Sequence, residues 1–192
     1  LMLGNLSPDV QRSVIERLTK RPKLIVMDTM NFWMDIAMDS LKQTIALVDV
    51  LTINVEEARQ LSGEYSLVKA AEKIFEMGPK YLVIKKGEHG ALLFHGVEQE
   101  VFSAPALPLK EVFAPTGAGD SFAGGFTSYL ASTDDVSFAN MKNAVIEGSA
   151  MASFTVEKFG PERLINLKRD DIADRIKAFR KLTQFTLDLK EA

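Results

Sequence analysis

One short stretch of the sequence combines glycines with a carboxylate in a pattern that suits phosphate chemistry. Thr116-Gly117-Ala118-Gly119-Asp120 forms a flexible segment that leads into a helix. Glycines allow the backbone to come close to a ligand, and the unpaired N–H groups of a first helical turn favour an anion. The segment therefore predicts a site for a phosphate group.

Two interpretations of this segment assign different roles to Asp120. In the simpler one, Gly117 and Gly119 form a tight turn and Asp120 caps a helix that begins at Ser121. In the other, the carboxylate lies beside a bound phosphoryl group and accepts a proton from the attacking hydroxyl, which offsets the cost of placing negative charges together. Amides that hold the moving charge and a base that orients the acceptor are what phosphoryl transfer to an alcohol requires.

A second set of polar residues follows a predicted strand. Asp28-Thr29-Met30-Asn31 comes directly after the apolar run 24–27. Ligands of doubly wound sheets bind at the carboxyl ends of the strands, which would place Asp28 and Asn31 beside the site. Both residue types are also ordinary turn formers after a strand, and that alternative stays open.

The elements around these residues predict an α/β domain. Predicted strands lie at 1–3, 24–27, 50–53 and 81–84, and predicted helices lie between Ser7 and Pro22 and at 36–47, 55–61 and 68–77. The alternation implies right-handed crossovers and helices on both faces of a mostly parallel sheet. After residue 86, two short runs indicate antiparallel strands, and the end of the chain is helical. We expect a three-layer, doubly wound α/β fold in a single domain over residues 1–192.

The composition excludes several classes of protein. The 192 residues include 23 Lys+Arg and 26 Asp+Glu, which gives a net charge of −3, and no Cys. A disulfide scaffold, a zinc ribbon and a thiol nucleophile are therefore excluded. The two histidines, His89 and His95, lie on either side of an apolar stretch, which argues against a His-rich metal site, and both are expected to be exposed to solvent in turns.

Charge and hydropathy also bear on location and partners. Lys and Arg are scattered, so the chain lacks the basic face that nucleic-acid binding requires. No apolar run approaches the roughly 20 residues of a membrane span, and the first residues do not resemble a signal peptide. We expect a cytoplasmic protein that binds neither nucleic acid nor membrane.

Three motifs together resemble those of one family. Residues 115–126 resemble the C-terminal signature of the ribokinase-like (PfkB) carbohydrate and nucleoside kinases. Asn54-Val55-Glu56-Glu57 resembles the N-x-x-E motif of that family, and Lys86-Gly87-Glu88-His89-Gly90 resembles its turn on the nucleotide side. The order and spacing of the motifs agree with the family over residues 24–159, which correspond to its C-terminal part.

The resemblance implies an ATP-dependent, Mg²⁺-requiring kinase that phosphorylates a hydroxyl of a sugar or nucleoside. It implies that Asp120 is the catalytic base and that Asn54 and Glu57 position Mg²⁺ and its waters. The implied anion hole is Gly117, Ala118 and Gly119, and the implied nucleotide-binding residues are Lys85, Lys86, Gly87, Gly90, Thr116 and Ser149.

Each of these assignments has a structural alternative. Asn54 followed by Glu57 also satisfies a helix capping box. Lys86 also suits a solvated strand end, and Ser149 also suits a tightly packed helix that needs small residues.

Two departures from the family pattern limit the expectation. Ala114 stands where the family usually has an Asp that contributes to a monovalent-cation site, which argues against K⁺ activation of the usual kind. The N-terminal glycine motif, sugar-binding Asp and β-strand lid of the family have no match. The alternative function is thus a nucleotide-binding fragment or inactive remnant. Because residues 1–5 look like the end of a buried strand, we expect a missing upstream segment or association into a homo-oligomer.

Overall fold

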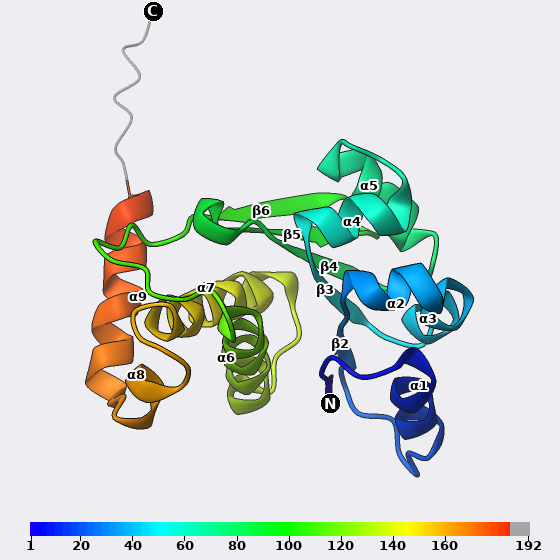
Figure 1. The fold of residues 1–192 in the computed structure, drawn as a ribbon, viewed down its shortest axis with the longest axis horizontal. Helices are drawn as coiled ribbons and strands as arrows, with labels where there is room; N and C mark the ends of the chain where they lie inside the picture. The colour runs from blue at the N-terminus through cyan, green and yellow to red at the C-terminus, as the bar shows by residue number, and fades with distance from the viewer. Residues whose placement is uncertain (185–192) are drawn as a thin grey trace, which may run out of the picture.

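The computed structural model describes residues 1–184, and the six strands found there form one sheet (Figure 1). The strands are β1 (Met2–Leu3), β2 (Val26–Asp28), β3 (Val50–Asn54), β4 (Tyr81–Lys85), β5 (Ala91–His95) and β6 (Glu100–Ala104), and their order in the sheet equals their order in the chain. β1 to β4 are parallel, whereas β5 and β6 each run antiparallel to the preceding strand. The predicted mixed sheet is confirmed.

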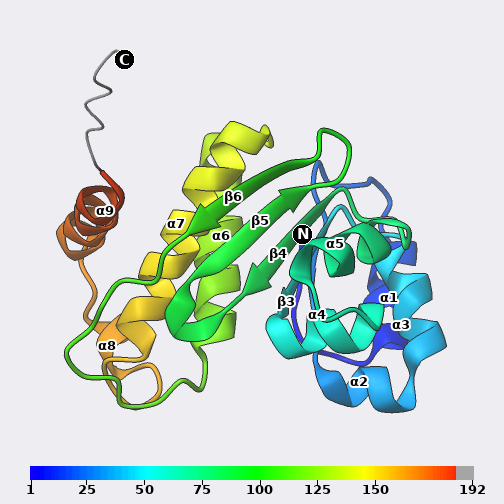
Figure 2. The ribbon, with the colours of Figure 1, turned by 90° about the horizontal axis from the view of Figure 1, so that it is seen from above.

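The helices cover the two faces of this sheet in two separate groups (Figure 2). One face packs against α1 (Pro8–Glu16), α2 (Asn31–Ile36), α3 (Met38–Ile45), α4 (Val55–Ser62) and α5 (Leu67–Phe75). Right-handed crossovers between strands in sequential order place all these helices on one side. The other face packs against α6 (Ala118–Thr133) and α7 (Phe138–Thr155), with α8 (Glu162–Ile165) and α9 (Arg169–Thr183) beyond α7. The three-layer architecture is confirmed.

Alternation along the buried strands divides the core into two clusters. Leu51 and Ile53 point toward the crossover helices, whereas Val50 points toward α6 and α7. Successive side chains of a strand point to opposite faces, so a strand covered on both faces needs a continuous apolar run. This is why the strands carry unbroken hydrophobic segments in the sequence.

Glycines allow α6 and α7 to cross closely. A Cβ atom at Gly148 would lie 2.7 Å from the carbonyl oxygen of Phe122, and one at Gly125 would lie 3.0 Å from Gly148 Cα. The first distance is shorter than real Cβ contacts allow and the second is unusually tight, so the observed packing requires glycine at 148 and favours it at 125. The crossing fixes the position of α6, whose first turn reaches the candidate site.

Two local predictions differ from the structure in part. The helix predicted over 36–47 is α3, which is slightly shorter, and a separate helix, α2, precedes it. Ala37, with φ −145°, interrupts the path between the two helices. The spacing of Val10, Val14, Ile15 and Leu18 predicts one buried face of the first helix. Ile15 and Leu18 do pack against the core, whereas Val10 and Val14 are exposed and Gln11 is buried. Gln11 is buried because its amide group donates to the carbonyl oxygens of Gly4 and Asp28.

An apolar groove lies between the β1–β2 edge of the sheet and α6. Its volume is about 380 Å³, and its lining includes Leu24, Val26, Leu130 and Val136. All six strands of the described residues belong to the one sheet, so none of them forms a separate lid. None of the described helices has the length and apolarity needed to span a bilayer.

Candidate functional site

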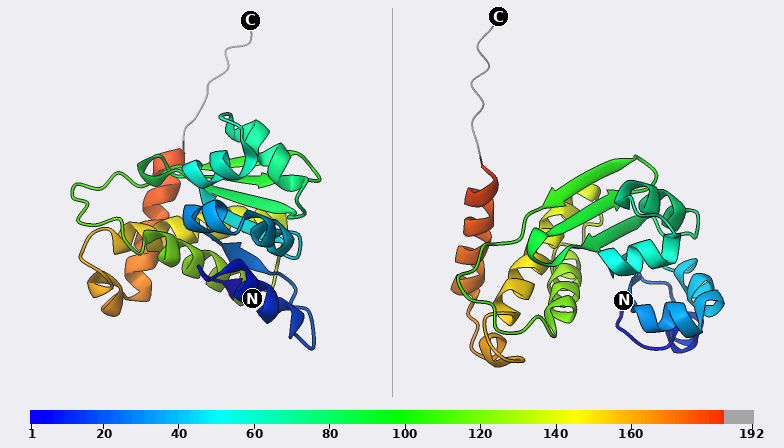
Figure 3. Two further views of the ribbon diagram at one scale, coloured as in Figure 1. Left: turned by 45° about the vertical axis from the view of Figure 1, so that its right-hand side comes forward. Right: turned by 45° about the horizontal axis from the view of Figure 1, so that its top comes forward.

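The polar residues singled out in the sequence gather at one edge of the sheet. The four parallel strands end at this edge, β5 begins there and β6 ends there. The loop between β6 and α6 leaves from the same edge and extends to the side of the molecule (Figure 3, left) before the chain returns to begin α6. Strand ends and a helix start are therefore brought together.

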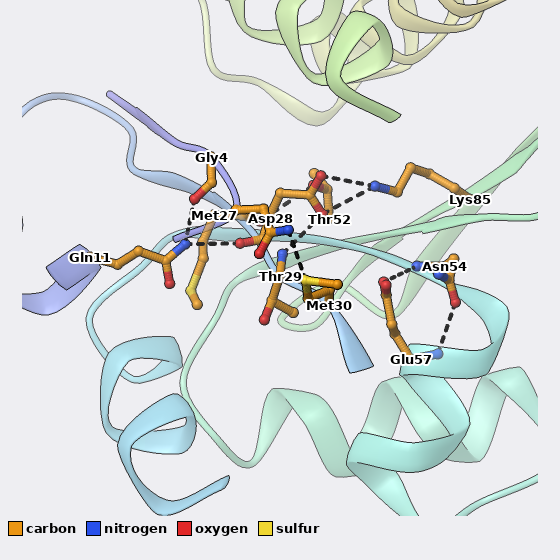
Figure 4. A network of polar contacts seen from close by, with 11 residues as sticks. Gly4, Gln11, Met27, Asp28, Thr29, Met30, Thr52, Asn54, Glu57 and Lys85 are labelled. Carbon is orange, nitrogen blue, oxygen red and sulfur yellow. Dashed lines mark hydrogen bonds and ion pairs between the residues drawn. The ribbon is translucent and has the colours of Figure 1, made fainter. Parts of the chain in front are cut away.

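An ion pair joins the ends of two strands that are not neighbours. Lys85, the last residue of β4, places its Nζ 3.1 Å from each carboxylate oxygen of Asp28, the last residue of β2 (Figure 4). The Lys85 side chain crosses β3 to reach Asp28. Thr52, on β3 beside Asp28 in register, is short, and its hydroxyl donates to the carbonyl oxygen of Met27.

The surroundings of Asp28 oppose its ionisation. Burial raises the pKa of Asp28, and the negative charge of Asp120 raises it further, whereas Lys85 and the N–H of Thr29 lower it. The Thr29 hydroxyl oxygen is buried without a hydrogen-bond partner in the described part of the chain. Buried polar groups are normally paired, so this is an incompletely satisfied region.

The start of α6 presents donors to the same edge. The helix begins at Ala118, directly after Gly117, whose φ of 85° lies in the left-handed region that glycine tolerates. Within residues 1–184, the backbone N–H groups of Gly119 and Asp120 donate to no backbone carbonyl. Unpaired N–H groups and the positive end of the helix dipole make such a terminus suited to an anion.

Asp120 does not act as the helix cap. It is the third residue of α6 and is exposed, and the capping position belongs to Gly117. The prediction that the helix begins at Ser121 with Asp120 as its cap is thus wrong. The carboxylate is free to face a ligand.

Lys85 links the strand ends to this helix terminus. A Cβ atom at Gly119 would lie 3.6 Å from Lys85 Nζ, so the ammonium group stands directly against the first turn of α6. On its other side it pairs with Asp28. One cation and a set of free amides thus flank the same space, with the carboxylates of Asp28 and Asp120 close by.

The end of α7 holds the start of α6 in place. Thr155 donates a hydrogen bond of 2.7 Å to the Ser121 hydroxyl, and its methyl group approaches Gly117. Thr116, which precedes the helix, is exposed and open to a ligand. The glycine-rich segment is therefore anchored to the end of α7.

Asn54 and Glu57 form the capping box at the start of α4. The Asn54 side chain accepts a 2.9 Å hydrogen bond from the Glu57 N–H, and Glu57 Oε2 accepts a 2.7 Å hydrogen bond from the Asn54 N–H. Burial raises the pKa of Glu57, while the Asn54 N–H and the charge of Lys85 oppose this shift. Glu57 Oε1 accepts no hydrogen bond from the residues that the structure describes, so one oxygen of this buried carboxylate stays available.

The turn after β4 lies beside the loop that leads to α6. The Lys86 N–H donates to the Gly90 carbonyl oxygen at 2.7 Å, and Gly87 to His89 form a single 3-10 turn. A Cβ atom at Gly90 would lie 2.0 Å from the Ala104 carbonyl oxygen, so this glycine is required by packing. Gly87 has open space around it.

Other predicted residues do not join this cluster. The Ser149 hydroxyl donates to the Val145 carbonyl oxygen within α7, which accords with the structural alternative for this residue. The Asn31 side chain donates to Gln60 of α4, away from Asp28.

The pairing of Asp28 with Lys85 was not predicted from the sequence, although the residue types at the strand ends allow such a pair. Parallel strands end at a common edge, so the last residues of β2 and β4 are separated only by β3. A carboxylate and a Lys at those two ends, with a short residue on the strand between them, can meet across it. Strand order has to be known before this inference is possible.

The comparison with known families accords with this geometry. The model of the pfkB family of carbohydrate kinases matches residues 2–169. The chain belongs to the pfkB family. Membership confirms the resemblance drawn from the three motifs and the ribokinase-like fold.

Several kinases are similar to the chain. A cytidine kinase of Thermococcus kodakarensis is 39% identical over 90 residues, which are 46% of this chain and 31% of that protein. A nucleoside kinase of Methanothermobacter thermautotrophicus is 30% identical over 140 residues, which are 72% of this chain and 40% of that protein. The crystal structure of ribokinase from Thermotoga maritima superposes with a TM-score of 0.71 at 26% identity, covering 92% of this chain and 56% of that one. The chain thus matches less than two thirds of the length of each relative.

Proposed function

We propose that this protein catalyses ATP-dependent phosphoryl transfer to a hydroxyl of a sugar or nucleoside, and that residues 1–192 form the nucleotide and phosphoryl-transfer part of that kinase. One observation carries the proposal: the free amides at the start of α6, Lys85 and the exposed Asp120 surround the same space. These are the parts that phosphoryl transfer to an alcohol requires.

Each group has a distinct role in the proposed reaction. The amides of the segment Gly117, Ala118 and Gly119 hold the charge of the transferred phosphoryl group, since fixed dipoles cost no reorganisation during the reaction. The Ala118 N–H also donates to the Pro115 carbonyl oxygen at 3.1 Å, so the Gly119 N–H is the less engaged donor of the two. Asp120 accepts the proton of the acceptor hydroxyl as the oxygen attacks phosphorus, and the bond from phosphorus to the bridging oxygen of ADP breaks. Lys85 adds a positive charge beside the phosphates.

The residues at the start of α4 fit a magnesium ion. Mg²⁺ keeps most of its water and is held by few protein oxygens, and Glu57 offers one buried carboxylate oxygen without a protein partner. When bound there, Mg²⁺ would neutralise phosphate charge. Asn54 contributes by fixing the Glu57 side chain through the capping box.

The nucleotide would extend from the helix start toward the turn after β4. Lys86 and Gly87 lie in that turn, and Thr116 lies in the loop directly before α6. Gly90 shapes the turn through its packing against Ala104. For Ser149, a contact with the adenine of the nucleotide stays a prediction.

The test is a calorimetric titration of Mg²⁺·ATP into the 192-residue chain and two variants. Glu57→Gln keeps the capping box, because Gln also accepts a hydrogen bond, but removes the charge that a metal needs. Glu56→Gln makes the same change at an exposed neighbour. We expect Glu57→Gln to weaken binding at least about tenfold and Glu56→Gln to change it by no more than about twofold.

A titration of ATP in the presence of a chelator serves as the second control. The difference between the Glu57→Gln variant and the unmodified chain should disappear when Mg²⁺ is removed. Equal weakening in both variants would contradict the metal role of Glu57. If the unmodified chain does not bind Mg²⁺·ATP, these residues do not form a nucleotide site in this chain.

The lack of a lid strand among residues 1–184 favours a second candidate, a nucleotide-binding fragment or remnant that does not turn over. Phosphoryl transfer needs water excluded and the acceptor held, and no strand of the described residues forms a lid over the site. Binding of Mg²⁺·ATP without phosphorylation of any sugar or nucleoside would favour this candidate.

Further expectations stay predictions. These are weak dependence on K⁺ because of Ala114, association of the chain into a homo-oligomer, and a cytoplasmic location.

A further inference from the structure

The β5–β6 hairpin brings one histidine and two glutamates together at the end of the sheet opposite the candidate site. His95 and Glu100 are directly opposite each other in the antiparallel register, so their side chains share a face. Glu98, in the turn between them, has its Oε2 3.2 Å from His95 Nδ1. One ligand atom from each of these three side chains lies within 4.8 Å of the other two.

Two aromatic neighbours hold the His95 ring in place. The ring stacks on Tyr81, its partner on β4, with 4.6 Å between centroids and 14° between planes. It also stacks on Phe138 of α7 at 5.6 Å. The side chain is 11% exposed, so the expectation of a solvent-exposed turn histidine is wrong. Nδ1 nevertheless faces the glutamates at the surface.

The turn that carries the glutamates is anchored as well. The Gly96 N–H donates to the Lys80 carbonyl oxygen at 3.0 Å, and a Cβ atom at Gly96 would lie 2.8 Å from the Phe75 ring. Gln99 has φ 53°, a left-handed conformation that side chains rarely adopt. The backbone on both sides of Glu98 is therefore held in one particular shape.

Negative charge accumulates at this end of the hairpin. After burial, the charges of Glu98 and Asp49 are what raise the pKa of Tyr81. Lys142 lies over the Phe138 ring at 4.6 Å. Lys80 lies 3.9 Å from Asp49. Both lysines are thus engaged elsewhere, Glu98 pairs with His95, and Glu100 forms no ion pair within residues 1–184.

We propose that His95, Glu98 and Glu100 bind a divalent transition-metal ion of the zinc type. An imidazole nitrogen with two carboxylates is a donor set that zinc accepts, whereas Mg²⁺ prefers oxygen ligands alone. Three protein ligands leave one position for water or for a ligand from another molecule. The ion would join the two strands of the hairpin across its turn and stabilise the folded chain by mass action. The site is separate from the proposed kinase site, at the other end of the sheet.

The test is a titration of the 192-residue chain with zinc chloride, without nucleotide, followed by calorimetry and by ¹⁵N NMR of the histidine rings. The chain has two histidines, so His89, whose side chain is 76% exposed, is an internal control. We expect one zinc ion per chain and a shift of the His95 ring nitrogens alone. Glu100→Gln leaves the ring stack intact and should weaken binding at least about tenfold.

Matched substitutions of the two histidines complete the design. His95→Gln should abolish saturable binding, and His89→Gln should leave the affinity within about twofold. Three results would overturn the site: no saturable zinc binding, a shift of the His89 signals instead, or equal affinity in Glu100→Gln and the unmodified chain. Because no nucleotide is present, these results are independent of the proposed kinase activity.

Discussion

The two ends of the parallel sheet each hold a buried aspartate, and the two carboxylates have different surroundings. Asp49, before β3, accepts hydrogen bonds from the Ile25 N–H at 2.9 Å and from Arg21 at 3.0 Å, and Lys80 lies 3.9 Å away. Asp28, at the end of β2, has Lys85 as its one cation in the described part of the chain and feels the repulsion of Asp120.

The difference separates a structural carboxylate from one in a functional region. Asp49 ties the backbone before β2 to that before β3 and is surrounded by donors. The partner of Asp28 stands against the first turn of α6, where an anion would compete for it. Buried groups with a perturbed pKa cluster at functional sites, because a bound ligand supplies the partner that such a group lacks. The buried carboxylate at the carboxyl end of the sheet therefore indicates a functional site, whereas the one at the amino end of β3 does not.

If the proposed kinase function holds, the largest effect is expected from Asp120→Asn. Loss of the base should lower kcat by about 10²- to 10⁴-fold, because the acceptor hydroxyl keeps its proton during attack. Calorimetry should show Mg²⁺·ATP binding nearly unchanged. Asp134→Asn makes the same change at the other end of α6 and should leave kcat within about twofold. A near-normal kcat for Asp120→Asn would refute the role of that carboxylate.

The contrast between the two buried aspartates is tested by removing one cation from each. Lys85→Met leaves Asp28 buried without a cation and should lower the free energy of unfolding by about 3 kcal/mol. Lys80→Met leaves Asp49 with Arg21 and the Ile25 N–H, and should cost less than about 1 kcal/mol. Urea denaturation of the two variants measures both. Equal losses would mean that the two ends of the sheet are electrostatically alike.

The position of α6 at the functional end depends on its crossing with α7. Gly148→Ala places a methyl group against the Phe122 carbonyl and should destabilise the fold by about 1–3 kcal/mol. Gly124→Ala, in the same pair of helices but with open space around it, should stabilise by about 0.5–1 kcal/mol. Thermal denaturation distinguishes the two signs, and destabilisation by both would show that the crossing is not the cause.

Much of the fold could be predicted from the sequence because the buried parallel strands leave a strong signal. The apolar runs before Asp28 and Asn54 are strands. The motifs at 54–57, 86–90 and 115–126 resemble those of the family that the chain belongs to. The start of α6 was predicted one turn too late in its capping alternative, since Gly117 rather than Asp120 precedes the helix.

The remaining features depend on tertiary contacts that the sequence pattern does not contain. Gln11 is buried because its amide bonds two distant carbonyls, and hydropathy counts it as a surface residue. Lys85 meets Asp28 only because β2, β3 and β4 are adjacent in that order. His95 is covered by Phe138, which lies far from it in the sequence. Such pairings become predictable only after the strand order and the α6–α7 layer are known.

The smallest effect is expected in how the free energy of unfolding depends on pH. Burial raises the pKa of Glu57, so the folded chain holds that proton more tightly than the unfolded chain does. The stabilisation is therefore complete below the pKa of the unfolded chain and is lost as the pH rises through the raised pKa of the folded state. Gln at this position keeps the capping box but has no such proton.

The difference in the free energy of unfolding between the unmodified chain and Glu57→Gln should therefore decrease as the pH rises through that window, and then stay level. Urea denaturation at a series of pH values gives this difference, and Glu56→Gln provides the reference for losing an exposed charge. A difference that does not change with pH would mean that Glu57 is ionised as easily in the folded chain as in the unfolded one. The carboxyl end of the sheet would then resemble the amino end more closely than the burial of Glu57 indicates, and the case for a metal ion that relieves this carboxylate would lose its electrostatic basis.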